Sequence, residues 1–215
     1  MSVPKLAGAN VLVAQIRMPI VGAWVSAVTS SADAAPTGSV LFEDGATKLR
    51  GYVTKAGSYG GRCRVSLVGG RGGLSKTVTA KPYRSIPARI VIADLLAFAG
   101  ETLSTRSDAG LLDTLLPFWH REAGTVGLAL SALAENALGA SWRVLDDGRI
   151  WIGRDSFPEQ AVTHRLDDLD EARRYALIAP DAPDLRPGVT FLNRQVIEVT
   201  HLITERIRTE VWFGS

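Results

Sequence analysis

The stretch "RVSLVGGRGGLSKTVTAKPY", residues 64–83, decides how the first part of the chain folds. Four glycines fall within residues 69–73, between two runs whose composition is typical of β-strands. A loop of this kind either cradles a phosphate, which would indicate an enzyme, or turns the chain within a sheet. The spacing of the residues around the glycines separates these two interpretations.

The spacing matches neither of the common phosphate-binding patterns. A P-loop requires G-x-x-x-x-G-K-[ST], and counting from Gly69 or Gly70 places Leu74 or Ser75 where the second glycine must stand. The dinucleotide pattern G-x-G-x-x-G fails because Ser75 takes the place of its third glycine, and the residues that follow look extended rather than helical. We therefore predict that the glycine loop is structural.

Residues 1–83 are predicted to form short strands and turns. "RCRVSLVGG" alternates apolar and polar residues, which is typical of a half-buried strand. This alternation places Cys63 on the apolar face, so we interpret it as a core residue and not as a reactive thiol. Asp44-Gly45 lies between two apolar runs and predicts a hairpin. The segment favours a small antiparallel barrel or sandwich.

Residues 84–155 change to a helical period. Helices are predicted in "SIPARIVIADLLAFAGE", "SDAGLLDTLLPFWHRE" and "TVGLALSALAENALG". Residues suited to capping or ending these three helices are, in chain order, Ser85 and Gly100, then Pro117, then Thr125 and Gly139. The following "SWRVLDDGRIWIG" predicts a hairpin with type I′ turn chemistry at Asp147-Gly148.

Residues 156–215 return to strands, of which "RQVIEVTHLITERIRTEVWF" predicts two long ones joined at Thr204-Glu205. The predicted class is therefore α+β and mainly β: two tube-like antiparallel β-barrel or sandwich segments with a helical insert closed by a β-hairpin. The predicted parts are an N-terminal β module (1–83), a helical insert with its hairpin (84–155) and a C-terminal β module (156–215).

Composition excludes several classes of function. Lys and Arg number 24 against 22 Asp and Glu, a net charge of +2, and the cations are scattered along the chain, so we expect no direct nucleic-acid recognition. Cys63 is the only cysteine, so no internal disulfide can form. The N-terminal apolar stretches are interrupted by polar residues and proline, so we expect a soluble chain without an export sequence or membrane span.

Candidate catalytic groups do not assemble into a recognisable constellation. No serine stands in G-x-S-x-G, and the three histidines lack a metal-binding spacing. "LDDLDEARR" brings acidic residues together at 167–171, which could supply a pair of catalytic carboxylates, but an acidic turn is the favoured interpretation. For the five tryptophans, a place in the core or at an interface is favoured over a role in sugar binding. We expect no catalytic residues, no cofactor and no metal.

The order of motifs resembles the baseplate hub proteins of long-tailed bacteriophages and related contractile injection systems. The resemblance is carried by the stretch from "GSVLFEDG" to "FAGETLS" (residues 38–104), by "WRVLDDGRIWIG", and by the closing "RPGVTF" and "VIEVTHLITERIRTEVW". It covers most of the chain from about Ser39 onward. Many such hubs are considerably longer, so this chain would be a compact version.

The resemblance implies a structural virion protein of the tail baseplate, made in the host cytoplasm. Its expected partners are two further copies in a homotrimer, the tail tube protein, a separate spike protein and other baseplate proteins. Such an adaptor would join the sixfold tube to the central spike through surface area alone. The residues expected at subunit contacts are Trp24, Gly69, Gly70, Arg71, Gly72, Gly73, Arg208 and Trp212.

Two other functions stay open at this point. The acidic run and the tryptophans would suit a tail-associated cell-wall hydrolase or carbohydrate-binding protein. A plain cytoplasmic binding domain without a role in assembly is the third alternative.

Overall fold

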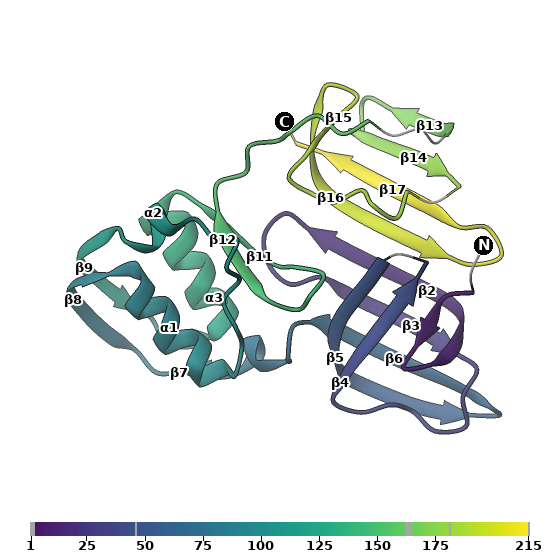
Figure 1. The fold of residues 1–215 in the computed structure, drawn as a ribbon, viewed down its shortest axis with the longest axis horizontal. Helices are drawn as coiled ribbons and strands as arrows, with labels where there is room; N and C mark the ends of the chain where they lie inside the picture. Colours follow the sequence, from purple (N-terminus) through teal and green to yellow (C-terminus); the bar gives the residue numbers. More distant parts are fainter. Residues whose placement is uncertain (1–2, 46, 162–164, 181, 215) are drawn as a thin grey trace.

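The structure is a computed structural model that describes residues 3–45, 47–161, 165–180 and 182–214 (Figure 1). Strands dominate and helices are few, so the predicted mainly β class is confirmed. Most strands belong to one large antiparallel sheet that begins as a barrel and continues as an open sheet. The helices lie together beside one end of the barrel.

Six strands close the barrel in the order β1-β4-β5-β6-β3-β2, because β1 pairs with both β4 and β2. Alternate side chains fill its interior, among them Ile16, Phe42, Leu49 and Val65, which are at most 2% exposed. The strands are β1 (Lys5–Leu6), β2 (Ala9–Pro19), β3 (Val25–Ser30), β4 (Ser39–Asp44), β5 (Thr47–Tyr59) and β6 (Arg62–Gly69).

Two expectations for the barrel are confirmed. The hairpin at Asp44-Gly45 joins β4 to β5, with Gly45 at a positive φ of 58°. Cys63 is fully buried and contributes to the core. β5 continues as far as Tyr59, so only Gly60 and Gly61 make the turn into β6.

The open sheet continues from the barrel wall through β2. β1 pairs with β2 at Ala9 and Asn10, whereas β16 pairs with residues 14–19 on the same edge of that strand. Beyond β16 the sheet runs β17-β14-β13, and a second core forms on it from residues such as Ile178, Val199 and Val211. The strands are β13 (Arg165–Asp170), β14 (Tyr175–Ala179), β15 (Thr190–Phe191), β16 (Arg194–Ile203) and β17 (Arg208–Phe213).

The helical part shares the core of the barrel. Val91, Ile92 and Leu95 of α1 are fully buried and belong to the same apolar cluster as the barrel interior. Its elements are η1 (Gly73–Ser75), β7 (Thr77–Val78), β8 (Lys81–Pro87), α1 (Ala88–Ala99), α2 (Ala109–Leu112), β9 (Leu115–Arg121), β10 (Gly124–Thr125), α3 (Val126–Ser131), the π-helical turn η2 (Ala132–Ala137), β11 (Ser141–Val144) and β12 (Ile150–Gly153).

Several predicted features of this part are confirmed. α1 ends at Gly100, which adopts the left-handed conformation at φ 76°. The Thr125 hydroxyl accepts a hydrogen bond from the Leu128 N–H and caps α3. Gly139, at φ 56°, follows η2. β11 and β12 pair as the predicted hairpin.

The prediction of Ser85 as a helix cap is wrong. Ser85 lies in β8, and α1 begins only after Pro87. A residue before proline is disfavoured in the helical conformation, so Ile86 stays extended and delays the helix. The type I′ turn is also wrong: Gly148 has a positive φ of 78° but Asp147 does not, and a type I′ turn needs both.

The predicted second helix is mostly a strand. Only Ala109–Leu112 are helical, and Leu115–Arg121 form β9, paired with β8. Pro117 removes a hydrogen-bond donor that a helix would need, whereas a two-stranded ribbon tolerates it on an open edge. His120 lies on this strand and is exposed.

An ionic cluster fastens α1 to the β8–β9 ribbon. The Tyr83 hydroxyl donates a hydrogen bond to the Asp94 carboxylate, and Lys81 Nζ lies 3.1 Å from the same oxygen. Buried Arg121 donates through Nη1 to both Asp94 and the Tyr83 hydroxyl, at 3.1 Å each. The Tyr83 hydrogen bond, helped by the two cations, holds the pKa of Asp94 below its usual value.

The division of the chain at residues 83 and 155 stays a proposal, because β2 and β16 join the first and last parts in one sheet. Among the described residues, no helix is both long and apolar enough to cross a membrane.

We predict that Asp94→Asn destabilises the fold by about 1–2 kcal/mol at pH 7. The expected loss of unfolding free energy is smaller than for a fully buried charged hydrogen bond, because the Asp94 side chain is partly exposed and solvent screens its charge. Urea denaturation measures it. The matched control is Asp113→Asn, since Asp113 pairs with Arg89 on the surface and should contribute less than about 1 kcal/mol.

The effect of Asp94→Asn should also depend on pH. Because folding lowers the pKa of Asp94, its contribution is complete above its unfolded pKa of about 3.9 and is lost as the pH falls through the folded value. The difference in stability between wild type and variant should therefore shrink below about pH 4. A difference that is constant from pH 7 to pH 3 would contradict this account.

Candidate functional site at the barrel end

The glycine loop does bind an anion, and that anion is a side chain of the same chain. The Glu101 carboxylate accepts hydrogen bonds from the backbone N–H of Arg71, at 3.0 Å from each oxygen, and from the N–H of Gly73 at 2.9 Å. Glu101 is only 7% exposed. Backbone N–H groups of a turn that converge in this way form an anion-binding nest. The prediction of a structural loop thus has a specific physical basis.

The same segment also closes the C-terminus of α1. Lys76, which follows the loop, donates through Nζ to the carbonyl oxygens of Phe98 and Ala99, at 3.5 and 3.1 Å. A cation is favourable at a helix C-terminus, whereas the Glu101 carboxylate is unfavourable there without donors of its own. The loop segment supplies the Lys76 cation and also the N–H donors for Glu101, so the barrel and α1 are fastened together at this point.

The glycines are required because other atoms take the space of a side chain. A Cβ at Gly73 would lie 1.9 Å from the Ala99 carbonyl oxygen, and one at Gly70 would lie 2.8 Å from the Glu101 carboxylate. Gly70 and Gly72 also adopt positive φ, of 90° and 83°. These close approaches are all made within the chain itself.

Trp24 is buried under the same part of the barrel. It is 2% exposed, and its indole lies so close that a Cβ at Gly51 or Gly69 would come within 2.6 Å of the ring. Gly69 N–H also donates to the Trp24 carbonyl oxygen at 2.8 Å. The single chain therefore buries Trp24 completely, between two strands that carry glycine where the ring lies.

The β11–β12 hairpin closes this end of the barrel through backbone hydrogen bonds. Gly22 N–H donates to the Trp142 carbonyl, and Val144 N–H donates to the Gly22 carbonyl, at 2.8 and 3.1 Å. At the hairpin turn, Arg50 N–H of β5 donates to the Asp146 carbonyl at 2.8 Å. The hairpin is thus fixed to the barrel at two places.

Two ion pairs connect the hairpin to its surroundings. Arg186, from the segment before β15, lies 2.9 Å from Asp146 through Nη2 and also donates through Nε. Arg143 lies 2.5 Å from Asp155, whose side chain is 5% exposed, and its guanidinium lies 4.2 Å from the Trp151 ring centre. The planar guanidinium group of arginine suits such partly buried pairs better than the point charge of lysine does.

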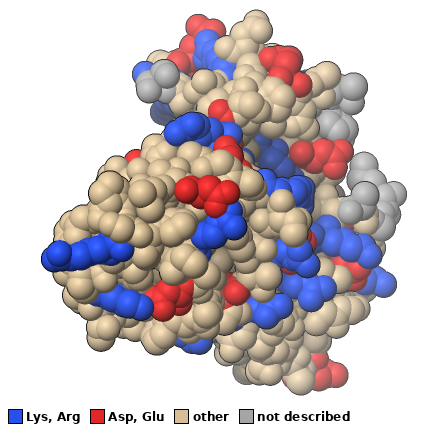
Figure 2. Space-filling model, turned by 60° about the vertical axis from the view of Figure 1, so that its left-hand side comes forward, with Lys and Arg blue, Asp and Glu red and all other residues tan. Residues whose placement is uncertain are grey.

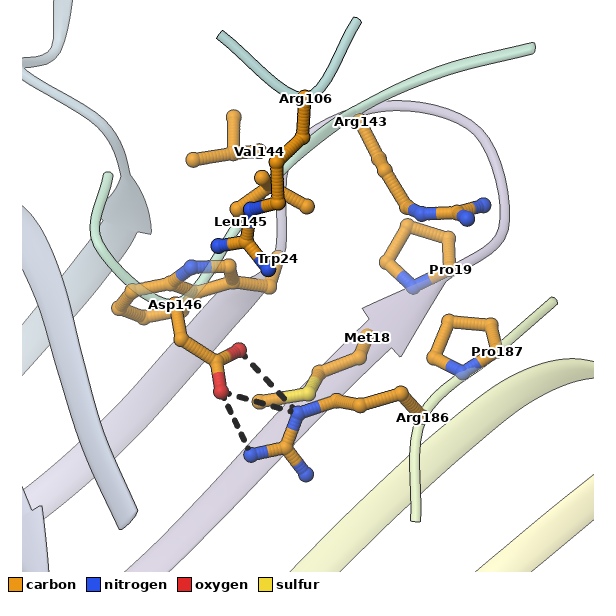
Figure 3. A pocket seen from close by; sticks show the side chains of 10 residues that line it. All are labelled: Met18, Pro19, Trp24, Arg106, Arg143, Val144, Leu145, Asp146, Arg186 and Pro187. Atoms are coloured by element: carbon orange, nitrogen blue, oxygen red, sulfur yellow. Dashed lines mark hydrogen bonds and ion pairs between the residues drawn. The ribbon is translucent and has the colours of Figure 1, made fainter. Parts of the chain in front are cut away.

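A cavity of about 170 Å³ lies where these parts meet (Figure 3). In Figure 3 the Asp146 carboxylate faces the Arg186 guanidinium, and the paired groups occupy one side of the cavity. The lining residues are Met18, Pro19, Trp24, Arg106, Arg143, Val144, Leu145, Asp146, Arg186 and Pro187. Carboxylates and guanidinium groups pair with each other here, and the remaining walls are mainly apolar, so the arrangement serves to join the parts.

The other candidate groups lie elsewhere. Asp167, Asp168 and Asp170 lie on the exposed strand β13, and Glu171 begins the turn that follows it. His164 lies outside the described residues, whereas His201 is buried in the sheet beside Thr209. In the described part of the chain, no three His, Cys, Asp or Glu residues gather closely enough to hold a metal ion.

The residues predicted at subunit contacts fall into two groups. Trp24 and the loop at 69–73 lie together at the barrel end, where only Arg71 is well exposed. Arg208 and Trp212 lie on β17 of the open sheet; Trp212 is 36% exposed and packs on Tyr175. A role of these residues between subunits stays a prediction.

Sequence reasoning missed the most connected residues of this site. Glu101 directly follows a helix-ending glycine, where a negative charge is unfavourable. That position could have indicated that hydrogen-bond donors from another segment compensate the carboxylate. Nothing in the sequence pairs Arg143 with Asp155 or Arg186 with Asp146, because these contacts depend on how the hairpin lies on the barrel.

No family model matches the chain, and no curated protein matches it significantly. Solved structures do match. The chain is similar to the 43 kDa tail protein of prophage MuSo2 from Shewanella oneidensis, with a TM-score of 0.67 and 12% identity over 98% of this chain and 97% of that one. It is also similar to a tail protein of Neisseria meningitidis MC58, with a TM-score of 0.63 and 12% identity over 97% and 95% of the two chains.

A third similar structure is the E. coli c3393 protein, described as a component of the type VI secretion system with structural similarity to the T4 tail proteins gp27 and gp5. Its TM-score is 0.65 at 13% identity, over 99% of this chain and 77% of that one. The chain thus has the fold of phage tail proteins and of a type VI secretion component.

We predict that Glu101→Ala destabilises the chain by about 2–4 kcal/mol, because two loop N–H groups lose a charged acceptor. Glu101→Gln, which keeps one acceptor oxygen, should lose less. Urea denaturation measures both, with Glu122→Gln as the control because the Glu122 side chain is 86% exposed. Equal stability of Glu101→Ala and the control would show that the nest does not hold the loop.

Proposed function

We propose that the chain is a structural component of a phage-type tail and acts without catalysis. The observation that carries the proposal is its likeness to the MuSo2 tail protein, which extends over nearly the whole of both chains. The Neisseria tail protein supports the same assignment at similar coverage. The location would be the virion tail, after synthesis in the host cytoplasm.

Within the tail, we assign the chain to the baseplate hub. It would form a homotrimer that joins the tail tube to the central spike, with other baseplate proteins around it. The likeness to c3393, itself described as similar to gp27 and gp5, favours this place. A complex described as Francisella PdpA-VgrG also contains a similar chain, with a TM-score of 0.51 at 6% identity.

The physical features of the fold suit a mechanical part. The barrel has a buried apolar interior, the hairpin is fastened across its end, and the open sheet is hydrogen-bonded to the barrel wall. Loads between neighbouring proteins would therefore pass through backbone hydrogen bonds and packed side chains. Arg208 and Trp212 remain proposed contact residues on the open sheet.

A cell-wall hydrolase is the less favoured alternative. Its proposed carboxylates, Asp167 and Asp170, lie on an exposed edge strand, and neither of them lines the cavity at the barrel end. Catalytic carboxylates that act on a sugar chain are expected to flank a groove.

We predict that antibodies against the chain label one end of isolated tails in immunogold electron microscopy. Deleting its gene should leave particles without complete tails, and a plasmid copy should restore them. Complete, infective particles after deletion would contradict the proposal. Peptidoglycan release by the wild type that is lost in Asp167→Asn or Asp170→Asn would instead support the hydrolase.

A further inference from the structure

Two strand edges of the large sheet have no partner strand in the described part of the chain. β5 pairs with β4 only as far as Tyr52, so its residues 54–59 have β6 on one side and an open edge on the other. β13 pairs only with β14, so the outer edge of residues 165–170 is open as well. Figure 1 shows β13 at the end of the open sheet that lies away from the barrel.

The open edge of β5 belongs to a basic arm. All residues from 54 to 62 are exposed, and Tyr59 is 92% exposed. Lys55 lies on the arm, with Arg62 and Arg64 on the paired strand β6. None of these three cations forms an ion pair with another residue that the structure describes.

The open edge of β13 has the opposite character. Asp168 and Asp170 lie on its outward face, opposite Leu177 and Tyr175 of β14. Leu166 and Leu169 lie on the other face and are 38% and 40% exposed. Their partners on β14 are fully buried in the second core, so this is the core face of the sheet.

The arm has the same two faces. Ala56 and Ser58 lie opposite the buried Val65 and Cys63, which marks their side as the core face. The odd-numbered residues of the arm, Lys55 among them, point outward. If the two edges paired with their core faces aligned, small and apolar side chains would meet on one face and opposite charges on the other.

The parts of the chain that carry the two edges also differ in net charge, in the same sense as the edges themselves. Residues 1–83 contain ten Lys and Arg against three Asp and Glu, whereas residues 156–215 contain seven against ten. The cations expected to be scattered are thus in excess on the barrel. In Figure 2, which brings the helical part forward, blue side chains lie both on that part and on the right of the view.

The geometry points to a head-to-tail contact between copies of this chain, in which the β5 edge at 54–59 pairs with the β13 edge at 165–170 of the next copy. The partner is a second copy because one chain carries both edges, which are equal in length and complementary in charge. Cross-strand pairs of opposite charge stabilise such a ladder. The contact specifies the self-assembly on which the proposed function rests.

A head-to-tail contact closes into a ring when its rotation permits. Each copy would then cover one edge of each neighbour, and neither of these two edges of the large sheet would remain open to pair with unrelated strands. Because part of the attraction is between exposed charges, added salt should weaken the contact.

Cysteine cross-linking tests the contact in the full chain. Gly57 and Asp168 are near the centres of the two edges and both face outward; a side chain at Gly57 would meet no atom within 4 Å. A short bis-maleimide should link Gly57→Cys chains to Asp168→Cys chains when the two are mixed, and should link neither variant to itself. Mixing Gly57→Cys with Glu122→Cys is the control. Wild type controls for Cys63, which is buried.

Charge reversal provides a second readout. Lys55→Glu and Asp168→Lys should each weaken self-association in light scattering by about tenfold or more, and the double variant should recover most of the loss. Thermal melts show whether each variant remains folded. Because both substitutions are on exposed edges, the melts should match the wild type.

Three outcomes would overturn the contact: a chain that stays monomeric at all concentrations, assembly without a preferred link between positions 57 and 168, or a double variant as weak as the single ones. A different result would assign the basic edge to nucleic acid. In that case the monomer binds duplex DNA, Lys55→Glu loses this binding, and no links form between copies. If antibodies label the tails but positions 57 and 168 do not cross-link, only this contact is overturned. If the chain forms cross-linked rings but is absent from tails, only the tail assignment is overturned.

Discussion

Strand β2 carries the constraint on which the rest of the structure depends. One of its edges pairs with β1 over its first two residues and with β16 over residues 14–19. The first pairing closes the barrel, and the second extends the same sheet outward. Because side chains alternate along a strand, both cores must lie on one face of this sheet, as Met18 and Val199 do in adjacent positions. The position of the open sheet relative to the barrel is therefore set by backbone hydrogen bonds and not by a linker.

The barrel end shows how the helical part is held on this frame. Glycines at 69–73 let the backbone approach Glu101 and Ala99 closely, and the resulting nest neutralises a carboxylate placed at a helix C-terminus. The hairpin is then fixed to the same end of the barrel by backbone hydrogen bonds with Gly22 and Arg50. Each of these contacts joins parts distant in sequence, so the helical part and the hairpin are held on the barrel.

Local patterns were enough to predict much of the fold. Alternation around Cys63, the Asp44-Gly45 turn and the caps at Gly100 and Thr125 depend on neighbouring residues only, and the structure confirms them. Prediction failed where a proline changed the outcome: Pro87 delayed α1, and Pro117 placed a strand where a helix was expected. The candidate site was predictable only as a structural glycine loop. Its partner Glu101 and the paired arginines come from distant segments, and no local pattern encodes such contacts.

Native-state hydrogen exchange tests most directly whether one continuous sheet unites the chain. If β2 joins the barrel to the open sheet, the central amides of β16 should open with the same free energy as those of β3 and β6, near that of global unfolding. Opening of β16 and β17 at a clearly lower free energy, while the β3–β6 ladder stays protected, would contradict the account and show a C-terminal part that unfolds by itself.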